Sequence, residues 1–149
     1  MAVPADSSDA VALTPLSGAA IVAFVATTDL ERAHAFYGGL LGLERTEAGA
    51  FANAYDGGGT SLRVTRVDRV AQAPYTVLGW RLDDLAAAIA ALAARGIALR
   101  RFAGLEHDDA GVWTAPGGAR IAWFDDPDGN LLSLTEPAPA TRPAGRDPV

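Results

Sequence analysis

The pattern of apolar and polar residues predicts the same set of elements twice along the chain. A buried strand is expected over residues 21–26, and Asp29 is placed to cap the helix that follows it. A second strand is expected over residues 75–82, and Asp84 caps a second helix. A glycine stops each helix. The first helix presents one apolar face, made of Leu30, Ala33, Phe36, Tyr37, Leu40 and Leu41.

Each predicted helix is followed by a segment that reads as two strands around a tight turn. Residues 55–64 parallel residues 124–134, with one residue fewer in the first turn. In the second turn, Pro127 fixes φ, and Gly129 can adopt a positive φ without a Cβ clash. Together with the strands and helices above, these segments predict two copies of a strand–helix–strand–strand–strand unit.

The repeat divides the chain into a single ordered domain with polar ends. The predicted parts are a flexible segment 1–17, a domain 18–136 with halves 18–67 and 75–136 joined by a linker 68–74, and a disordered Pro-rich tail 137–149.

Composition restricts the classes of function. The chain has 149 residues, of which half are apolar, and a net charge of −6. This charge argues against partners such as nucleic acid or an anionic membrane surface, which require clustered Lys and Arg. The sequence has no cysteine, which excludes disulfides and thiolate metal sites. No apolar run is long enough to span a bilayer, and the start does not read as a signal peptide, so a cytoplasmic protein is expected.

Three motifs resemble the vicinal-oxygen-chelate superfamily, the group of glyoxalases, bleomycin-resistance proteins and extradiol dioxygenases. They are Asp29-Leu30-Glu31-Arg32-Ala33-x-x-Phe36-Tyr37 with Leu41-Gly42-Leu43, then Arg81-Leu82-Asp83-Asp84-Leu85, then Phe124 to Glu136. The resemblance covers residues 19–136. It implies an α+β fold in which two βαβββ half-modules form a curled mixed sheet around one pocket.

The resemblance also implies where metal ligands would stand in a metal-dependent member. The four positions hold Val22, Arg63, Val77 and Ser133 in this chain. The two valines offer no lone pair, and the permanent positive charge of Arg63 repels a metal ion. We therefore expect no metal and no cofactor at this site.

Strand alternation predicts which residues point to the pocket side of the sheets, and the four positions above are among them. The candidate ligand-binding residues placed in this way are Arg63, Arg81, Ser133, Phe24, Val22 and Val77, and Trp113 is a further candidate whose orientation the sequence does not give. Arg63 and Arg81 are expected either to clamp an anionic group of a ligand or to pair with an acid such as Asp83, Asp125 or Glu136. Phe102 and Trp123 are further aromatic candidates.

The two histidines also have alternative interpretations. His34 is expected on the helix surface. His107 is expected in a solvated loop, with an acid or base at the pocket mouth as the alternative.

These residues favour a metal-free small-molecule-binding module of the bleomycin-resistance kind. The alternative is an enzyme of the lyase, isomerase or dioxygenase type that acts on a small oxygenated or anionic metabolite. A metal-free enzyme would use Arg63 to hold an oxyanion and His107 as a base. A third alternative is a regulatory domain without a pocket. Relatives of this size commonly form a homodimer, and the sequence leaves this open.

Overall fold

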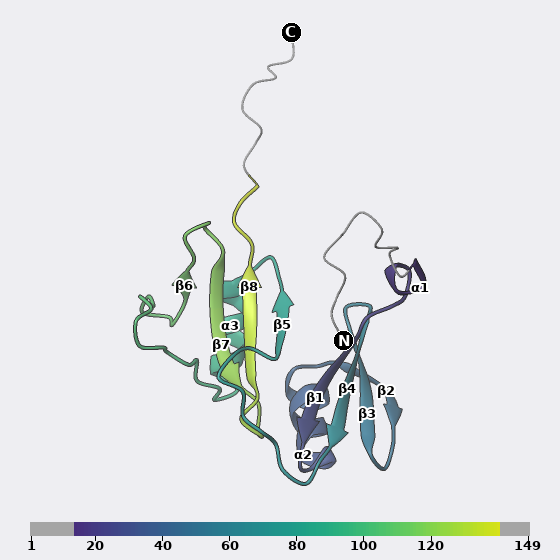
Figure 1. The fold of residues 1–149 in the computed structure, drawn as a ribbon. Coiled ribbons are helices and arrows are strands. Elements are labelled where there is room, and N and C mark those ends of the chain that lie inside the picture. The colour runs from purple at the N-terminus through teal and green to yellow at the C-terminus, as the bar shows by residue number, and fades with distance from the viewer. Residues whose placement is uncertain (1–13, 141–149) are drawn as a thin grey trace, which may run out of the picture.

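The computed structural model describes residues 14–140, and Figure 1 shows them as two halves that follow each other along the sequence. Most of the predicted flexible segment 1–17 and of the predicted disordered tail 137–149 lies outside the described residues. At the inner ends of these two segments, α1 (Thr14–Ser17) is a short helix and residues 137–140 have no regular structure. No helix in the described part of the chain is long and apolar enough to cross a membrane.

Each half contains the predicted strand–helix–strand–strand–strand unit. The first half consists of β1 (Val22–Thr27), α2 (Leu30–His34), η2 (Ala35–Leu40), β2 (Glu44–Ala48), β3 (Ala52–Gly57) and β4 (Thr60–Arg66). The second half consists of β5 (Leu78–Arg81), α3 (Leu85–Ala94), β6 (Trp113–Thr114), β7 (Arg120–Asp125) and β8 (Leu131–Glu136). An irregular segment of residues 97–112 separates α3 from β6, so the second half is less regular than the first.

The predicted helix caps are present. The Asp29 carboxylate accepts hydrogen bonds from the backbone N–H groups of Glu31 and Arg32 at 3.0 and 3.1 Å. Asp84 accepts one from Ala87 at 3.0 Å. These bonds satisfy N–H groups that have no partner within the helix, so both helices begin where the sequence predicts.

The first helix is not a single α-helix as predicted. After α2 the chain continues as η2, a π-helical segment in which the Leu41 N–H donates to the Phe36 carbonyl at 2.8 Å. The wider turn accompanies the burial of two consecutive aromatic residues, Phe36 and Tyr37.

The strands form two four-stranded mixed sheets, in the orders β1-β4-β3-β2 and β5-β8-β7-β6. In each sheet the first strand of the half runs parallel to the last one, and the remaining pairs are antiparallel. The predicted α+β fold of two βαβββ halves is therefore confirmed. The two sheets are not closed into one, because β1 and β5 each remain at a sheet edge without pairing to one another.

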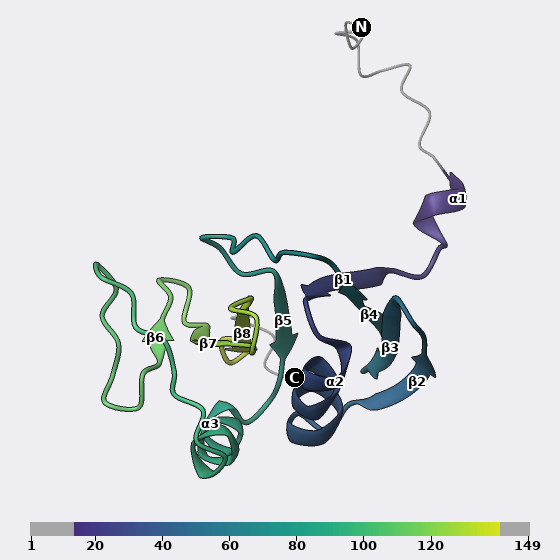
Figure 2. The same ribbon diagram turned by 90° about the horizontal axis from the view of Figure 1, so that it is seen from below.

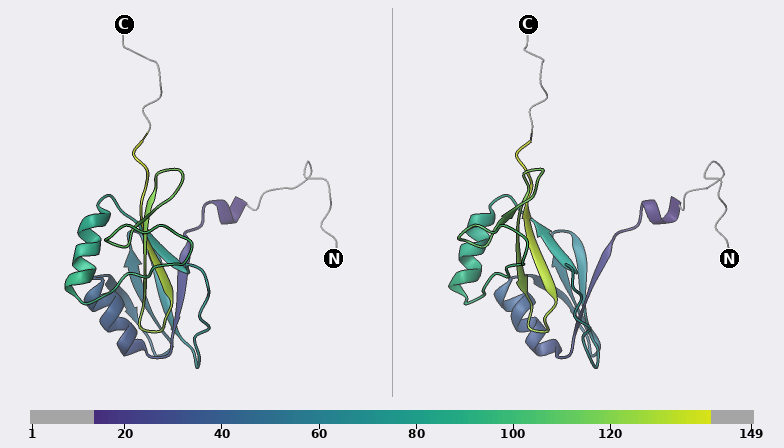
Figure 3. Two further views of the ribbon diagram at one scale, coloured as in Figure 1. Left: turned by 90° about the vertical axis from the view of Figure 1, so that its left-hand side faces the viewer. Right: turned by 60° about the vertical axis from the view of Figure 1, so that its left-hand side comes forward.

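The core lies between the sheets and the helices, which cover the same side of the molecule (Figures 2 and 3). Strand residues that alternate towards the helices are buried, among them Val25, Val64, Phe124 and Leu132. The side chains between them in sequence point to the opposite side. We call that opposite side of both sheets the open face.

The turn between β7 and β8 bonds the second half to the first. The Asn130 side-chain amide donates to the Ala26 carbonyl at 2.8 Å, and the Thr27 hydroxyl donates to Asp128 at 2.6 Å. Arg32 pairs with the same Asp128 carboxylate at 2.6 Å. The motif that dominates the sequence resemblance thus joins the end of β1 and the start of α2 to the second sheet.

Candidate functional site

Strand register places the candidate ligand-binding residues of the first half on the open face. Phe24 is the neighbour of Arg63 in the parallel pair of β1 and β4, while the adjacent Val25 and Val64 are buried in the core. Phe24 is 62% exposed, and Val22 is exposed on the same strand. The open face of the first sheet therefore offers an apolar surface to solvent.

Arg63 forms an ion pair that the sequence did not predict. Its guanidinium group lies 3.7 Å from the Glu47 carboxylate. Two of the acids expected to pair with it are used elsewhere, since Asp125 pairs with Arg100 at 3.1 Å and Glu136 pairs with Arg120 at 3.2 Å. The Arg63 side chain is 38% exposed and that of Glu47 62% exposed, so solvent screens this ion pair and it holds the Arg63 side chain only weakly.

Arg81 remains available for a ligand. It is exposed at the end of β5, where it neighbours Thr135 of β8. No described residue forms an ion pair or a side-chain hydrogen bond with its guanidinium group.

The open face of the second sheet carries a group of rings that we call the aromatic cluster: Trp113, Trp123, Phe102 and His107. The Trp123 ring centroid lies 6.0 Å from that of Trp113, 5.2 Å from Phe102 and 6.1 Å from His107. Trp123 is also the cross-strand neighbour of Ser133, so a hydroxyl group adjoins the rings. The sequence identified Phe102, Trp113 and Trp123 as candidates but could not orient them.

Trp123 is fixed from both ends. Its indole N–H donates to the Thr76 hydroxyl at 3.1 Å. Its backbone forms an isolated antiparallel bridge with the backbone of Arg100, which lies in the irregular segment. The Arg100 guanidinium group lies over the Phe102 ring at 5.5 Å, within the range of a cation–π interaction. A cation therefore stands at the border of the cluster.

His107 has a structural role within the cluster. The Phe102 backbone N–H donates to Nε2 at 3.0 Å, and Nδ1 lies 2.9 Å from the Gly111 carbonyl oxygen. An N–H can only donate and a carbonyl can only accept, so these partners assign the proton to Nδ1 of a neutral ring. Both nitrogens are occupied, and Arg63 lies on the other sheet, so the structure does not bring the two residues together as base and oxyanion holder.

His34 also uses a ring nitrogen within the fold. Its Nδ1 lies 3.0 Å from the Tyr55 hydroxyl, and the two rings stack. The side chain is partly buried between α2 and β3.

The four positions that would hold a metal do not form a donor set. Val22 and Arg63 stand on one sheet, and Val77 and Ser133 belong to the other. Valine cannot coordinate a metal, and arginine is a permanent cation. In the described residues there is also no group of three or more His, Asp or Glu side chains that could hold an ion. The chain's residues thus do not fit the metal of metal-dependent members.

A cleft that the sequence analysis missed lies on the helix side of the sheets. It is an apolar cleft between the end of η2 and α3, with a volume of about 310 Å³. Its lining residues are far apart in sequence. From the sequence alone, such apolar residues are interpreted as part of the core, so nothing indicated a cleft.

Comparison with known proteins gives a consistent result. Residues 19–134 match the family described as the Glyoxalase/Bleomycin resistance protein/Dioxygenase superfamily. No curated protein matches the chain.

Solved structures resemble the chain in fold. A glyoxalase/bleomycin resistance protein/dioxygenase from Alicyclobacillus acidocaldarius has 21% identity over 80% of this chain and 91% of its own, with a TM-score of 0.62. A lactoylglutathione lyase from Agrobacterium tumefaciens has 19% identity over 80% and 93%, with a TM-score of 0.63. A genomically encoded fosfomycin resistance protein from Listeria monocytogenes has 14% identity over 80% and 93%, also with a TM-score of 0.63.

Proposed function

The chain belongs to the Glyoxalase/Bleomycin resistance protein/Dioxygenase superfamily, and on that premise we propose that it is a metal-independent binding module for a small, planar, anionic molecule. The donor set supports metal independence, because Val22, Arg63, Val77 and Ser133 cannot replace the ligands of a metal site. The open face supports binding, since it presents rings, hydroxyl groups and cations.

The aromatic cluster is the observation that carries this proposal. Trp113 and Trp123 lie with ring planes inclined by 33°, and the edge of Phe102 meets Trp123 at 86°. A flat ligand can stack on such rings, and aromatic pairs contribute about 0.5–1.5 kcal/mol beyond the area that they bury. Ser133 adds a hydrogen-bonding group beside Trp123.

The cations of the second half favour an anionic ligand. Arg81 has no acidic partner among the described residues, and Arg100, which is paired with Asp125, lies at the border of the cluster with its remaining N–H groups. The guanidinium group binds a carboxylate or phosphate through paired hydrogen bonds. The net charge of the whole chain is negative, which by itself would favour cationic ligands. The local cations at this face would instead select an anionic ligand over a cationic one.

We propose that a second copy of the chain completes the pocket. The open face exposes large apolar side chains close to the two unpaired edge strands, with Val22 43%, Phe24 62% and Tyr75 66% exposed. The segment with α1 extends away from its own sheets, as both views in Figure 3 show. An unpaired strand edge beside exposed apolar residues is suited to pair with another chain.

Isothermal titration with 2-naphthoate, a planar anion, tests the proposed function. We expect binding of equal affinity with and without EDTA, and no binding of the non-planar cyclohexanecarboxylate. Trp123→Leu should weaken 2-naphthoate binding by about tenfold, because it removes the central ring of the cluster.

Trp80→Phe is the matched control, because Trp80 lies on the helix side of β5 and packs against Phe124. It should leave the affinity for 2-naphthoate unchanged. Loss of binding in EDTA would contradict metal independence. Equal affinities of Trp123→Leu and wild type would contradict the assignment of the aromatic cluster.

A further inference from the structure

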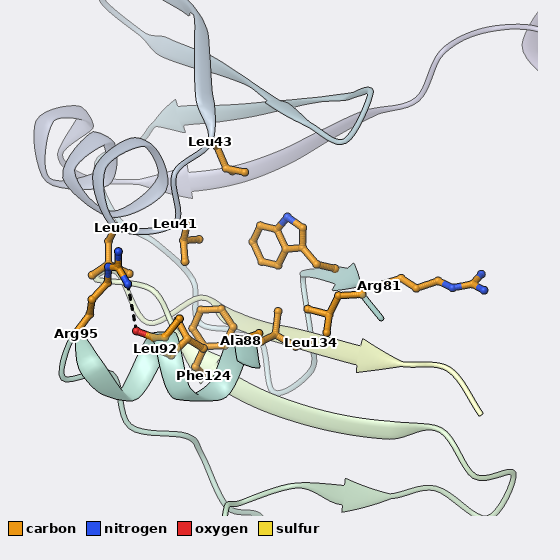
Figure 4. A pocket seen from close by; sticks show the side chains of 12 residues that line it. Leu40, Leu41, Leu43, Arg81, Ala88, Leu92, Arg95, Phe124 and Leu134 are labelled. Atoms are coloured by element: carbon orange, nitrogen blue, oxygen red, sulfur yellow. Dashed lines mark hydrogen bonds between the residues drawn. The ribbon is translucent and has the colours of Figure 1, made fainter. Parts of the chain in front are cut away.

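The cleft lies on the helix side of the second sheet, opposite the open face, and Arg81 at the end of β5 borders it as well. Figure 4 shows it from close by, with Leu40 and Leu41 on one side and α3 on the other. Its volume is about 310 Å³. At about 30 Å³ per water-sized group, it has room for on the order of ten such groups, at the lower end of ligand pockets.

The cleft exists because α3 presents small side chains to it. Ala88 and Ala91 line the helix wall, whereas Leu40 and Leu41 project from the end of η2. The buried residues Phe124 and Leu134 lie beneath them. The surface is therefore aliphatic for most of its length, which suits an alkyl chain better than a polar molecule.

Besides Arg81, a second cation borders this apolar surface. Arg95 stands at the end of α3 and lines the cleft, as Figure 4 shows. One nitrogen donates to the Ala91 carbonyl at 3.3 Å, and no described residue offers it a carboxylate. The other N–H groups of this guanidinium remain available for an anion.

Trp80 supplies a further unused donor. Its ring stacks on Phe124 with the centroids 6.5 Å apart, and it lines the cleft. Within residues 14–140 nothing accepts a hydrogen bond from its indole N–H. The cleft thus combines a long aliphatic surface with the free indole N–H of Trp80 and those guanidinium N–H groups of Arg95 that do not bond to Ala91.

We propose that this cleft binds a medium-chain fatty acid, with the alkyl chain between η2 and α3 and the carboxylate at Arg95. The aliphatic walls match the chain, and the unpaired guanidinium group matches the head group. This site does not depend on the function proposed for the open face.

Isothermal titration with hexanoate, octanoate and decanoate tests the chain. Each added methylene should tighten binding by about fourfold as long as it is buried in the cleft. Octanoate should bind about fivefold more tightly than its neutral analogue octanamide, the upper range for an exposed ion pair. Affinities that do not change with chain length would overturn the proposal.

Two pairs of variants locate the site. Ala91→Trp fills the cleft and should abolish octanoate binding, whereas Ala90→Trp, on the same helix but outside the cleft, should not. Arg95→Gln should remove the preference for octanoate over octanamide. Arg101→Gln, an exposed arginine outside the cleft, should keep it. Equal effects within either pair would overturn the assignment.

Further measurements separate this site from the other sites of the chain. Trp123→Leu should bind octanoate normally, and Ala91→Trp should bind 2-naphthoate normally, so that failure of one site is distinguishable from failure of the other. Sedimentation of Ala91→Trp should match that of wild type. A change in its oligomeric state would mean that a second copy covers the cleft and would overturn the proposal.

Discussion

Asp128 joins the two halves of the chain through one buried carboxylate. Its side chain is 3% exposed and accepts hydrogen bonds from the hydroxyl groups of Thr27 and Thr28, besides its ion pair with Arg32. Burial alone would raise the pKa of Asp128, but the hydrogen bonds and the nearby cation outweigh burial and hold the pKa below its ordinary value. The ionised form therefore stabilises the folded state.

We predict that Asp128→Asn lowers the free energy of unfolding at neutral pH by about 1.5–3 kcal/mol, the range for hydrogen bonds to a charged group. Because the folded-state pKa lies below the unfolded value of about 3.9, this contribution is complete above that value and is lost as the pH falls through the folded-state pKa. Urea unfolding should therefore give a constant difference between variant and wild type at about pH 5–7 and a shrinking one below about pH 4.

Asp83→Asn is the matched control for this measurement. Asp83 is exposed and bonds to no described side chain, so its substitution should leave the urea midpoint unchanged. A difference for Asp128→Asn that persists unchanged into the acid range would show that the charge of Asp128 does not matter.

Asp126, two residues earlier in the same turn, accepts hydrogen bonds from other residues than Asp128 does. Its buried carboxylate accepts the Tyr37 hydroxyl at 2.6 Å and the Asn130 amide at 2.7 Å. Burial raises the pKa of Tyr37, and the charge of Asp126 raises it further. Tyr37 thus stays protonated and acts as a permanent donor that anchors the first helix to the second half.

The π-helical segment η2 contains two consecutive glycines, Gly38 and Gly39. A Cβ at Gly38 would lie 2.5 Å from the Cε1 atom of the His34 ring, whereas a Cβ at Gly39 would meet no atom within 4 Å. The His34 ring cannot move freely, because it is stacked on Tyr55 and bonded to its hydroxyl group. The two glycines are adjacent in sequence, but only a Cβ at Gly38 would meet another side chain.

We predict that Gly38→Ala is less stable than Gly39→Ala by about 0.5–1.5 kcal/mol, the range for one lost hydrogen bond. Gly39→Ala itself should be neutral or stabilising by up to about 1 kcal/mol, since alanine favours helices. Thermal and urea unfolding of both variants measure the difference. Equal stability would mean that His34 moves aside without loss and that its bond to Tyr55 contributes nothing.

Local patterns in the sequence predicted the elements that local physics determines. The caps at Asp29 and Asp84 and the alternation in β1 and β4 are confirmed, because each depends on residues a few positions apart. The ion pair of Arg63 with Glu47 was not predictable. The pair depends on an irregularity in β2 between Arg45 and Glu47, because this shift in register places Glu47 opposite Ala54.

The aromatic cluster could not be predicted from the sequence for a related reason. Phe102 and His107 reach Trp123 through the irregular segment after α3, whose path is set by contacts such as the His107 bonds to Phe102 and Gly111. Periodicity carries no signal for such a segment. The sequence could name the aromatic candidates, and only the fold could bring them together.

For the whole molecule, the relation between the two sheets decides how a pocket forms. The residues at the former ligand positions are divided between the sheets, two on each, and β1 and β5 do not pair. If a second copy completes the pocket, the first sheet of one chain faces the second sheet of the other. Restoring metal ligands separately on each sheet can test this arrangement.

We predict that a chain with Val22→His and Arg63→Glu, coexpressed with a chain carrying Val77→His and Ser133→Glu, yields a dimer that binds zinc tightly. Each chain by itself supplies two ligands, and a stable tetrahedral site requires four. Either variant coexpressed with wild type should therefore bind zinc only weakly. If coexpressed variants fail while one chain with all four substitutions binds zinc, the two sheets face each other within a single chain. Zinc titration of the purified complexes separates these arrangements, because only a pocket shared between copies can gather the four ligands from two different chains.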